Sequence, residues 1–537
     1  MTPRARTLWG LYTAVLVVLC SGGCGQRGSS RSSQSLAGPR DQGPTIGHVA
    51  KTVYPQALPL DGYGLVGGLP GTGSAECPAG VREYLRRYAQ SQVSGNQSVD
   101  LNGLLSSREA AVVYVEAVLP PASLKGERFD VKVTALSRTE TTLLEGGWLF
   151  TGEINPKGLS GIPVRSLALA EGPVYIDRLS SAAVDRRAGY VLGGGRLLEQ
   201  PQVLVVLRNP DFRMASAVRN LINERFGPDT ARALSPTQIE LQVPLAYRQQ
   251  RSRFFAIVEA IYLDQTPEVI QDRVTTLVRT LAAAVDKTPH EVALEAIGPA
   301  SLAKLEGLLQ SPDEQTRLAA ARCMANQGSL RGLQALVRIA FDSTSPRRDQ
   351  AVKALAASGR SPEAVSALVG LLADPHREVA MTAYEELLKV DPTAVSSVPI
   401  GGGAVLDEVP GGAGRAIVTF RSLRPRVALF GQVTCRPGRL LESTDGMITL
   451  DSRASDASLL ATRRHPVRRS VISRVRCSTN LHDLIQVLCG EPPSEAQGQG
   501  GLGVSYSGLV SLLKQACDSG FVDADFWAGP MPGSGQR

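Results

Sequence analysis

Apolar and polar residues alternate over several short stretches between residues 46 and 264, and valine is frequent in them. Alternation at a period of two is typical of a strand with one buried face. Asn209-Pro210-Asp211 interrupts the pattern, and Asp211 is expected to cap a helix that runs to about Phe226. This region is therefore predicted to be a mixed α+β core. The predicted strands are residues 110–119, 129–136, 203–207, 239–244 and 255–261.

The pattern changes between residues 265 and 395, where apolar residues recur every three or four positions. Helices with one apolar face alternate along the segment in pairs, with a period of about 30 residues. The clearest copy is Leu371-Leu-Ala-Asp-Pro-His-Arg-Glu-Val379. The segment resembles short bacterial HEAT repeats, so we expect a helical connection at 265–297 and an all-α HEAT-like solenoid at 298–395. A plain helical bundle is the alternative.

Two glycine-rich stretches, 396–412 and 491–502, are expected to be linkers. They enclose the most basic part of the chain, residues 413–490, which we expect to be a small β-containing segment. Residues 503–537 are predicted to form a helix that is closed by Gly520, followed by a short strand at 521–526. The fold class predicted for the whole chain is therefore multi-domain α+β.

The basic segment 413–490 contains 13 arginines, five acidic residues and no lysine, which accounts for the whole formal net charge of +7. Guanidinium groups bind phosphates and carboxylates through two parallel hydrogen bonds. An anionic partner is therefore expected: peptidoglycan, another anionic envelope polymer or an acidic protein face. A solvated basic surface is the alternative, and nucleic acid is not expected because few aromatic residues are interleaved for base stacking. The candidate contact residues are Arg463, Arg464, Arg468 and Arg469.

The first 24 residues predict export. Arg4 and Arg6 precede a short apolar run that ends in small residues before Cys24, which is typical of a secretory signal. The end of the run resembles a bacterial lipobox, so Cys24 is the expected lipidation site, with ordinary cleavage nearby as the alternative. Residues 25–45 are rich in glycine, serine and glutamine and are expected to be a flexible tether.

The glycine-rich run from Asp61 to Gly73 resembles nucleotide-binding motifs only in its letters. A dinucleotide fingerprint needs a strand before it and a helix directly after it. Two prolines before this run disfavour a central strand, and Pro70 stands where the helix should begin. A P-loop is excluded because no lysine follows Gly73. A tight turn packed against a neighbouring sheet or subunit is expected instead. Its structural glycines are Gly62, Gly64, Gly67, Gly68, Gly71 and Gly73.

The same run resembles the signature of the flagellar P-ring protein family, I/V-G-Y-G-L-V-x-G-L-x-G-T-G-D. Two positions differ, because Gly68 replaces an apolar residue and Ser74 replaces aspartate. Similar motifs follow in the same order, covering roughly residues 46–264, and 503–537 loosely resembles the family's C-terminus. The matching segments are Ala110–Pro121, Lys125–Ser137, Leu143–Leu149, Leu207–Phe212 and Ile222–Phe226.

No arrangement of catalytic residues can be recognised in the sequence, so no enzymatic activity and no cofactor are expected. The histidines are scattered, and Cys477-x4-His482-x6-Cys489 matches no standard zinc spacing, so no metal site is expected either. Since an exported chain can form disulfides, some pairing among Cys435, Cys477 and Cys489 is possible. Cys477 and Cys489 are the candidates to pair.

The family resemblance implies a structural subunit of the flagellar basal body. Such a subunit assembles with copies of itself into the P ring, a periplasmic bushing around the rod, and meets the rod and L-ring proteins. It would support motility and reside in the periplasm, here with the outer membrane as the expected place of any lipid anchor. The alternative is a divergent envelope lipoprotein, without a role in motility, that uses the HEAT-like repeats as a docking scaffold.

Overall fold

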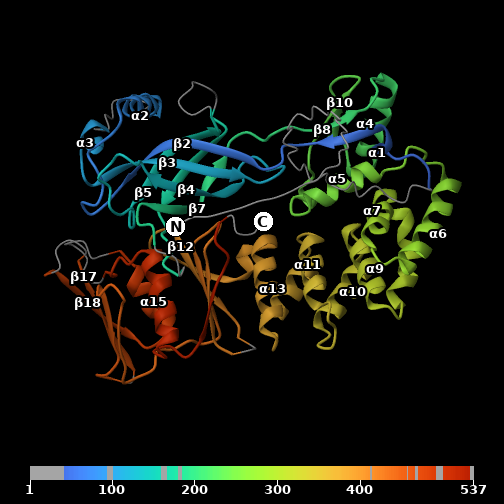
Figure 1. The fold of residues 1–537 in the computed structure, drawn as a ribbon. Helices are drawn as coiled ribbons and strands as arrows, with labels where there is room; N and C mark the ends of the chain where they lie inside the picture. The colour runs from blue at the N-terminus through green and yellow to red at the C-terminus, as the bar shows by residue number, and fades with distance from the viewer. Residues whose placement is uncertain are drawn as a thin grey trace, which may run out of the picture. The chain divides into compact units, whose positions relative to one another are not determined.

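The computed structural model describes residues 42–92, 101–158, 166–179, 184–411, 414–455, 457–465, 470–491 and 500–532. Figure 1 shows sheets at both ends of the sequence with a run of helices between them. The α+β class predicted from the sequence is confirmed.

A small antiparallel sheet with strand order β1-β8-β10-β9 forms one part of the core. The side chain of Asp211 accepts a hydrogen bond from the Arg213 N–H at 2.7 Å and caps α4, as predicted. The expected strands at 203–207 and 239–244 are present as β8 and β10. The elements are α1 (Ile46–Val49), β1 (Ala50–Val53), β8 (Val203–Leu207), α4 (Phe212–Phe226), β9 (Ala231–Ala233), β10 (Gln238–Leu241) and α5 (Arg251–Ala260).

The strand predicted at 255–261 is wrong, because this segment belongs to helix α5. Six of its ten residues are buried, and five of them form an unbroken apolar run from Phe254 to Val258. A short apolar run of this kind cannot be assigned to strand or helix by periodicity alone.

Six antiparallel strands close into a barrel in the order β2-β3-β4-β7-β6-β5. Inward side chains such as Val131, Val133 and Leu149 are fully buried in its core. The strands predicted at 110–119 and 129–136 are confirmed as β3 and β4. The elements are β2 (Leu58–Gly67), α2 (Ala79–Gln92), α3 (Leu101–Leu105), β3 (Ala110–Leu119), β4 (Arg128–Ala135), β5 (Trp148–Pro156), β6 (Ala168–Pro173) and β7 (Ala188–Leu197).

Helices α6 to α13 follow without an intervening strand, as predicted for residues 265–395. Their apolar faces share one continuous core, which contains Leu336, Leu355 and Leu368. Figure 1 shows α9, α10, α11 and α13 following one another along this segment. The helices are α6 (Pro267–Ala283), α7 (Thr288–Ile297), α8 (Leu302–Leu305), α9 (Glu314–Asn326), α10 (Leu330–Phe341), α11 (Arg348–Ala357), α12 (Pro362–Leu371) and α13 (Arg377–Val390).

Two sheets and two helices form the C-terminal module. The strand orders are β11-β12-β14-β13-β19 and β15-β16-β17-β18, and helices α14 and α15 share a core with them. The elements are β11 (Ser396–Ile400), β12 (Ala404–Val409), β13 (Ala416–Phe420), β14 (Arg426–Phe430), β15 (Leu440–Glu442), β16 (Ile448–Asp451), β17 (Ser458–Arg464), β18 (Ile472–Ser478), α14 (Leu481–Cys489), α15 (Tyr506–Asp518) and β19 (Asp525–Ala528).

The C-terminal module differs from expectation at two places. Residues 396–412, expected as a linker, contain the hairpin of β11 and β12, and Gly402 and Gly403 form its turn at φ +72°. Gly520 follows α15 at φ +68°, as expected for a helix stop, but the strand after it begins only at Asp525. Most of the linker expected at 491–502 lies outside the described residues.

Candidate functional site

The glycine run begins inside barrel strand β2 and not in a turn that leads to a helix. Gly62 lies opposite Val115 and Gly64 opposite Val113 of β3. Pro59 belongs to the same strand, so the expectation that proline excludes a strand here was wrong. Pairing with β5 starts only at Leu60, which leaves Pro59 near a strand end, where proline is tolerated.

Three glycines of β2 face atoms that leave no room for a side chain. A Cβ on Gly62 would lie 2.4 Å from the carbonyl oxygen of Glu153, and one on Gly67 would lie 2.5 Å from the Phe150 ring. At Gly64 the nearest atom would be Leu149 Cδ1, at 2.8 Å. These glycines therefore allow β2 to pack closely against β5.

The rest of the run forms the turn that was expected. Gly68 and Gly71 adopt φ of +74° and +78°, which side chains other than glycine rarely tolerate. A Cβ on Gly73 would lie 2.0 Å from the carbonyl oxygen of Ala110, where the chain passes the start of β3. The next helix, α2, begins only at Ala79. The run thus lacks the helix N-terminus that the P-loop and the dinucleotide fingerprint place against a phosphate.

The candidate arginines do not form one surface. Arg463 points inward, where its guanidinium donates to the carbonyl oxygens of Leu502 and Gly503, and burial lowers its pKa. Arg464 is the next residue of β17 and is exposed on the opposite face. Arg468 and Arg469 lie outside the described residues. Arg463 therefore has a structural role that its neighbour does not share.

The candidate cysteines carry free thiols in the structure. Burial raises the pKa of Cys489 to about 12 and that of Cys477 to about 11. Burial also raises the pKa of Cys435 to about 12, with a smaller contribution from the neighbouring Cys477 and Cys517. The pairing of Cys477 with Cys489 stays a prediction, which peptide mapping under non-reducing conditions tests.

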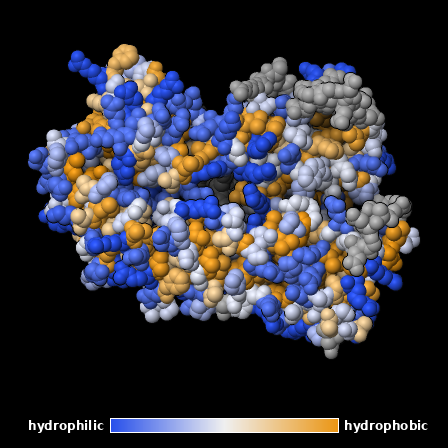
Figure 2. All heavy atoms as spheres, turned by 180° about the vertical axis from the view of Figure 1, so that it is seen from behind, coloured by the Kyte–Doolittle hydropathy of each residue, from blue (hydrophilic) through white to orange (hydrophobic). Residues whose placement is uncertain are grey.

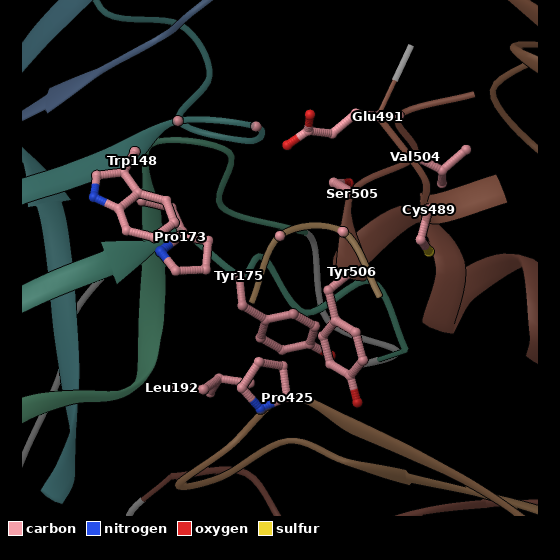
Figure 3. A pocket seen from close by; sticks show the side chains of 16 residues that line it. Trp148, Pro173, Tyr175, Leu192, Pro425, Cys489, Glu491, Val504, Ser505 and Tyr506 are labelled. Carbon is pink, nitrogen blue, oxygen red and sulfur yellow. The ribbon is translucent and has the colours of Figure 1, made fainter. Parts of the chain in front are cut away.

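A cavity of about 230 Å³ lies between the barrel and the C-terminal module. Figure 3 shows Trp148 and Pro173 on one side of it, with the rings of Tyr175 and Tyr506 side by side. Those two ring centroids are 5.7 Å apart. The cavity is smaller than the ~300 Å³ at which sites for drug-sized ligands begin.

Figure 2 shows hydrophobic and hydrophilic residues interspersed over the face turned away in Figure 1.

Sequence reasoning missed a buried ionic cluster that joins the α+β core to the helical segment. Arg253 of α5 donates to Glu291 at 2.9 Å and to Glu295 at 2.7 Å, and both carboxylates of α7 are fully buried. Arg322 of α9 contacts Glu291 at 2.6 Å, and Asn326 donates to Glu295. Two glutamates one helical turn apart on the apolar face of α7 are the sequence signal that could have pointed to this cluster.

A second buried cluster joins the last repeat helix to the C-terminal module. Asp407 of β12 is fully buried and accepts hydrogen bonds from Tyr384 of α13 and from Arg426 of β14. Burial and this carboxylate raise the pKa of the Tyr384 hydroxyl. The helical segment is therefore attached through buried charges at both ends.

The remaining predicted features concern membranes and metals. Cys24 and the signal segment lie outside the described residues. Within the described part of the chain, no helix has the length and apolar character needed to cross a bilayer. No group of three or more histidine, cysteine, aspartate or glutamate side chains in that part is placed to hold a metal ion.

Two family models match the chain. Flagellar P-ring protein matches residues 46–288, which include the barrel and the small sheet, and HEAT repeats match residues 301–389. The expected repeat segment is thereby confirmed. The P-ring match ends at 288, so the resemblance of residues 503–537 stays a prediction.

Several curated relatives are each named Flagellar P-ring protein. The relative from Anaeromyxobacter dehalogenans is 32% identical over 237 residues, 41% of this chain and 61% of that protein. The Thermotoga maritima relative is 33% identical over 219 residues, again 61% of its length. The Wolinella succinogenes relative is 30% identical over 258 residues, 45% of this chain and 70% of that protein.

The chain thus spans 61% of the length of the first relatives it matches, and the glycine motif on β2 lies within the matched region. The matched part is the barrel with its small companion sheet, followed by helix α6. On this evidence the chain belongs to the flagellar P-ring protein family.

Proposed function

We propose that this chain is a structural subunit of the flagellar P ring, a periplasmic ring that acts as a bushing around the rod and supports motility. The observation that carries the proposal is the family match over residues 46–288, which includes the glycine strand β2. Gly62, Gly64 and Gly67 allow β2 to pack closely against β5, which is a structural role. We therefore do not propose catalysis or a cofactor.

A ring of identical subunits requires head-to-tail interfaces that close by rotation. We propose that β5 contributes to this interface, because Trp148 and Phe150 are 47% and 44% exposed on it. Aromatic side chains are enriched in protein interfaces, where they contribute much of the binding energy. The further partners proposed are the rod and the L-ring protein.

Deletion of the gene, followed by electron microscopy of basal bodies, tests the proposal. We expect basal bodies without a P ring and cells that do not swim, and restoration of both by the wild-type gene. P rings that persist in swimming deletion cells would contradict the proposal. They would support the docking lipoprotein that the HEAT-like repeats suggest as an alternative.

The interface is tested in the same strain. We expect Trp148→Ser combined with Phe150→Ser to fold normally and to fail to form rings. The control is Leu245→Ser, because Leu245 is 85% exposed on a different part of the chain. Rings that form normally with the double variant would exclude β5 from the interface.

A further inference from the structure

The outer face of the sheet formed by β15 to β18 carries three exposed arginines in neighbouring positions. Strand residues alternate between faces, and Leu459 and Ala461 of β17 face the core with Val475 and Cys477 of β18. Arg464, Arg474 and Arg476 therefore point the other way, and all three are exposed. We define this surface, with Thr449 and Thr462, as the arginine face.

The register of the strands fixes how the arginine face is arranged. Arg474 and Arg476 are two residues apart on β18, so they are separated by about 7 Å. Arg464 lies opposite Ile472, and this places it diagonal to Arg474, again at about 7–8 Å. Thr462 lies opposite Arg474, and Thr449 lies opposite Thr462. Thr462 is thus the direct neighbour of Arg474, and Thr449 lies one strand further away on the same face.

These charges are not compensated within the described part of the chain. Other arginines of the module are paired there: Arg426 with Asp407, Arg453 with Asp451 and Arg436 with Asp523. Among the described residues, Arg464, Arg474 and Arg476 form no ion pair with a carboxylate. Asp451 lies on the same face, two strands from Arg476, and pairs with Arg453 instead. Three like charges so close together repel one another, and an external anion would relieve that repulsion.

An alternative role of such charges is to protect the edge of a sheet from pairing with another strand. β18 is an edge strand of its sheet, and charged residues on edge strands prevent such pairing. That role does not explain Arg464, because β17 is paired on both sides.

We propose that the arginine face binds a phosphate-bearing glycan polymer. Guanidinium pairs phosphate oxygens with two parallel hydrogen bonds, and the threonine hydroxyls can donate to the same group or to a sugar. An extended polymer with repeated phosphates can meet all three arginines along an open sheet face, where no cavity is needed. Strands β15 to β18 contain no aromatic residue, which disfavours base stacking and an aromatic protein anchor.

The proposal does not rest on the P-ring role, because the arginine face lies outside the residues that match that family. It is tested by the retention of the purified full chain on phosphomannan, with neutral mannan as the matched uncharged glycan. We expect retention on phosphomannan only, and weaker retention as salt rises.

The variant that tests the site replaces Arg464, Arg474 and Arg476 by serine. We expect the affinity for phosphomannan to fall at least about tenfold, since three charge-assisted contacts are lost. The control replaces three exposed arginines elsewhere, Arg213, Arg338 and Arg424, and removes the same charge. For this control, the decrease in the logarithm of the affinity for phosphomannan should be less than half of the decrease for the first variant. Circular dichroism verifies that both variants are folded.

Each other outcome would overturn the proposal. Equal losses in the two variants would show that net charge, and not this face, attracts the polymer. Tighter binding to poly-glutamate than to phosphomannan would assign the face to an acidic protein. Preference for anionic phospholipid vesicles would assign it to a membrane surface, and preference for single-stranded DNA to nucleic acid.

Discussion

Gly62 and Gly71 belong to one motif but are constrained for different physical reasons. A side chain at Gly62 would collide with a backbone oxygen, whereas Gly71 has open space and a positive φ. We expect Gly62→Ala to lower the free energy of unfolding by about 1–3 kcal/mol through overpacking. Gly71→Ala should lower it by about 1–2 kcal/mol through backbone strain.

Gly80 is the matched control for these substitutions. It lies in helix α2 with open space and no positive φ. Gly80→Ala should leave the free energy of unfolding unchanged or raise it by up to about 1 kcal/mol. Urea titration of the three variants measures the differences, and equal effects at all three positions would refute the distinction.

The ionic cluster at Arg253 gives a second prediction at the scale of single residues. Arg253→Met leaves Glu295 buried with only the amide of Asn326, and this should cost about 3–5 kcal/mol of unfolding free energy. Arg253→Met combined with Glu295→Met should cost less than the single change, because no carboxylate is then left without its cation.

The exposed ion pair of Lys514 with Asp518 is the control for this cluster. Lys514→Met should alter stability by less than about 1 kcal/mol. Thermal unfolding monitored by circular dichroism ranks the three variants. A double variant that is less stable than Arg253→Met would contradict the proposed role of charge burial.

At the scale of residues, the sequence predicted features that depend on neighbouring residues, and it predicted few contacts between residues that are far apart in the chain. The cap at Asp211 and the left-handed Gly520 depend on neighbouring residues, and both were predicted correctly. The inward direction of Arg463 depends on carbonyl groups about 40 residues away, at Leu502 and Gly503. Strand alternation predicts that Arg463 and Arg464 point to opposite faces of the sheet. Only the strand register shows which of the two faces the core.

Whole elements were predicted best where one face is apolar and the other is polar. Helix α10 keeps that contrast, because Leu333, Leu336 and Ile339 are buried whereas Arg331, Gln334 and Arg338 are exposed, and the segment that contains it was predicted to be helical. Helix α5 lacks it and was mistaken for a strand. The hairpin of β11 and β12 was missed because its glycine-rich turn resembles a linker, and because its partner strand β14 follows only after β13.

Helix α12 offers a test of the repeat core. Leu371 is fully buried, whereas Val369 on the same helix is 39% exposed. Leu371→Asp should cost about 4 kcal/mol or more, because it buries a carboxylate without a partner. Val369→Asp should cost less than about 1 kcal/mol. Limited proteolysis would detect unfolding of the segment, and similar cleavage of both variants would refute the assigned helix face.

At the scale of the molecule, we propose that the mature protein begins with a lipidated Cys24. Cys24→Ala should prevent incorporation of radiolabelled palmitate and should leave the chain uncleaved or release it from membranes. A wild-type protein without label, or a variant that matures normally, would contradict the prediction. The mature length of the variant on gels distinguishes failed cleavage from release.

The two buried clusters at the ends of the helical segment limit how the protein can evolve. The C-terminal module also contacts the barrel directly, because Ser507 accepts a hydrogen bond from the Ile176 N–H at 2.9 Å and Arg421 pairs with Asp177. The helical repeats thus connect the α+β core to the C-terminal module, and these two parts also contact each other directly. In an open repeat array each unit contacts only its neighbours, so units can be added or removed, but one extra unit here would separate the C-terminal module from the barrel. We therefore expect homologues with the same C-terminal module to keep the same number of repeats.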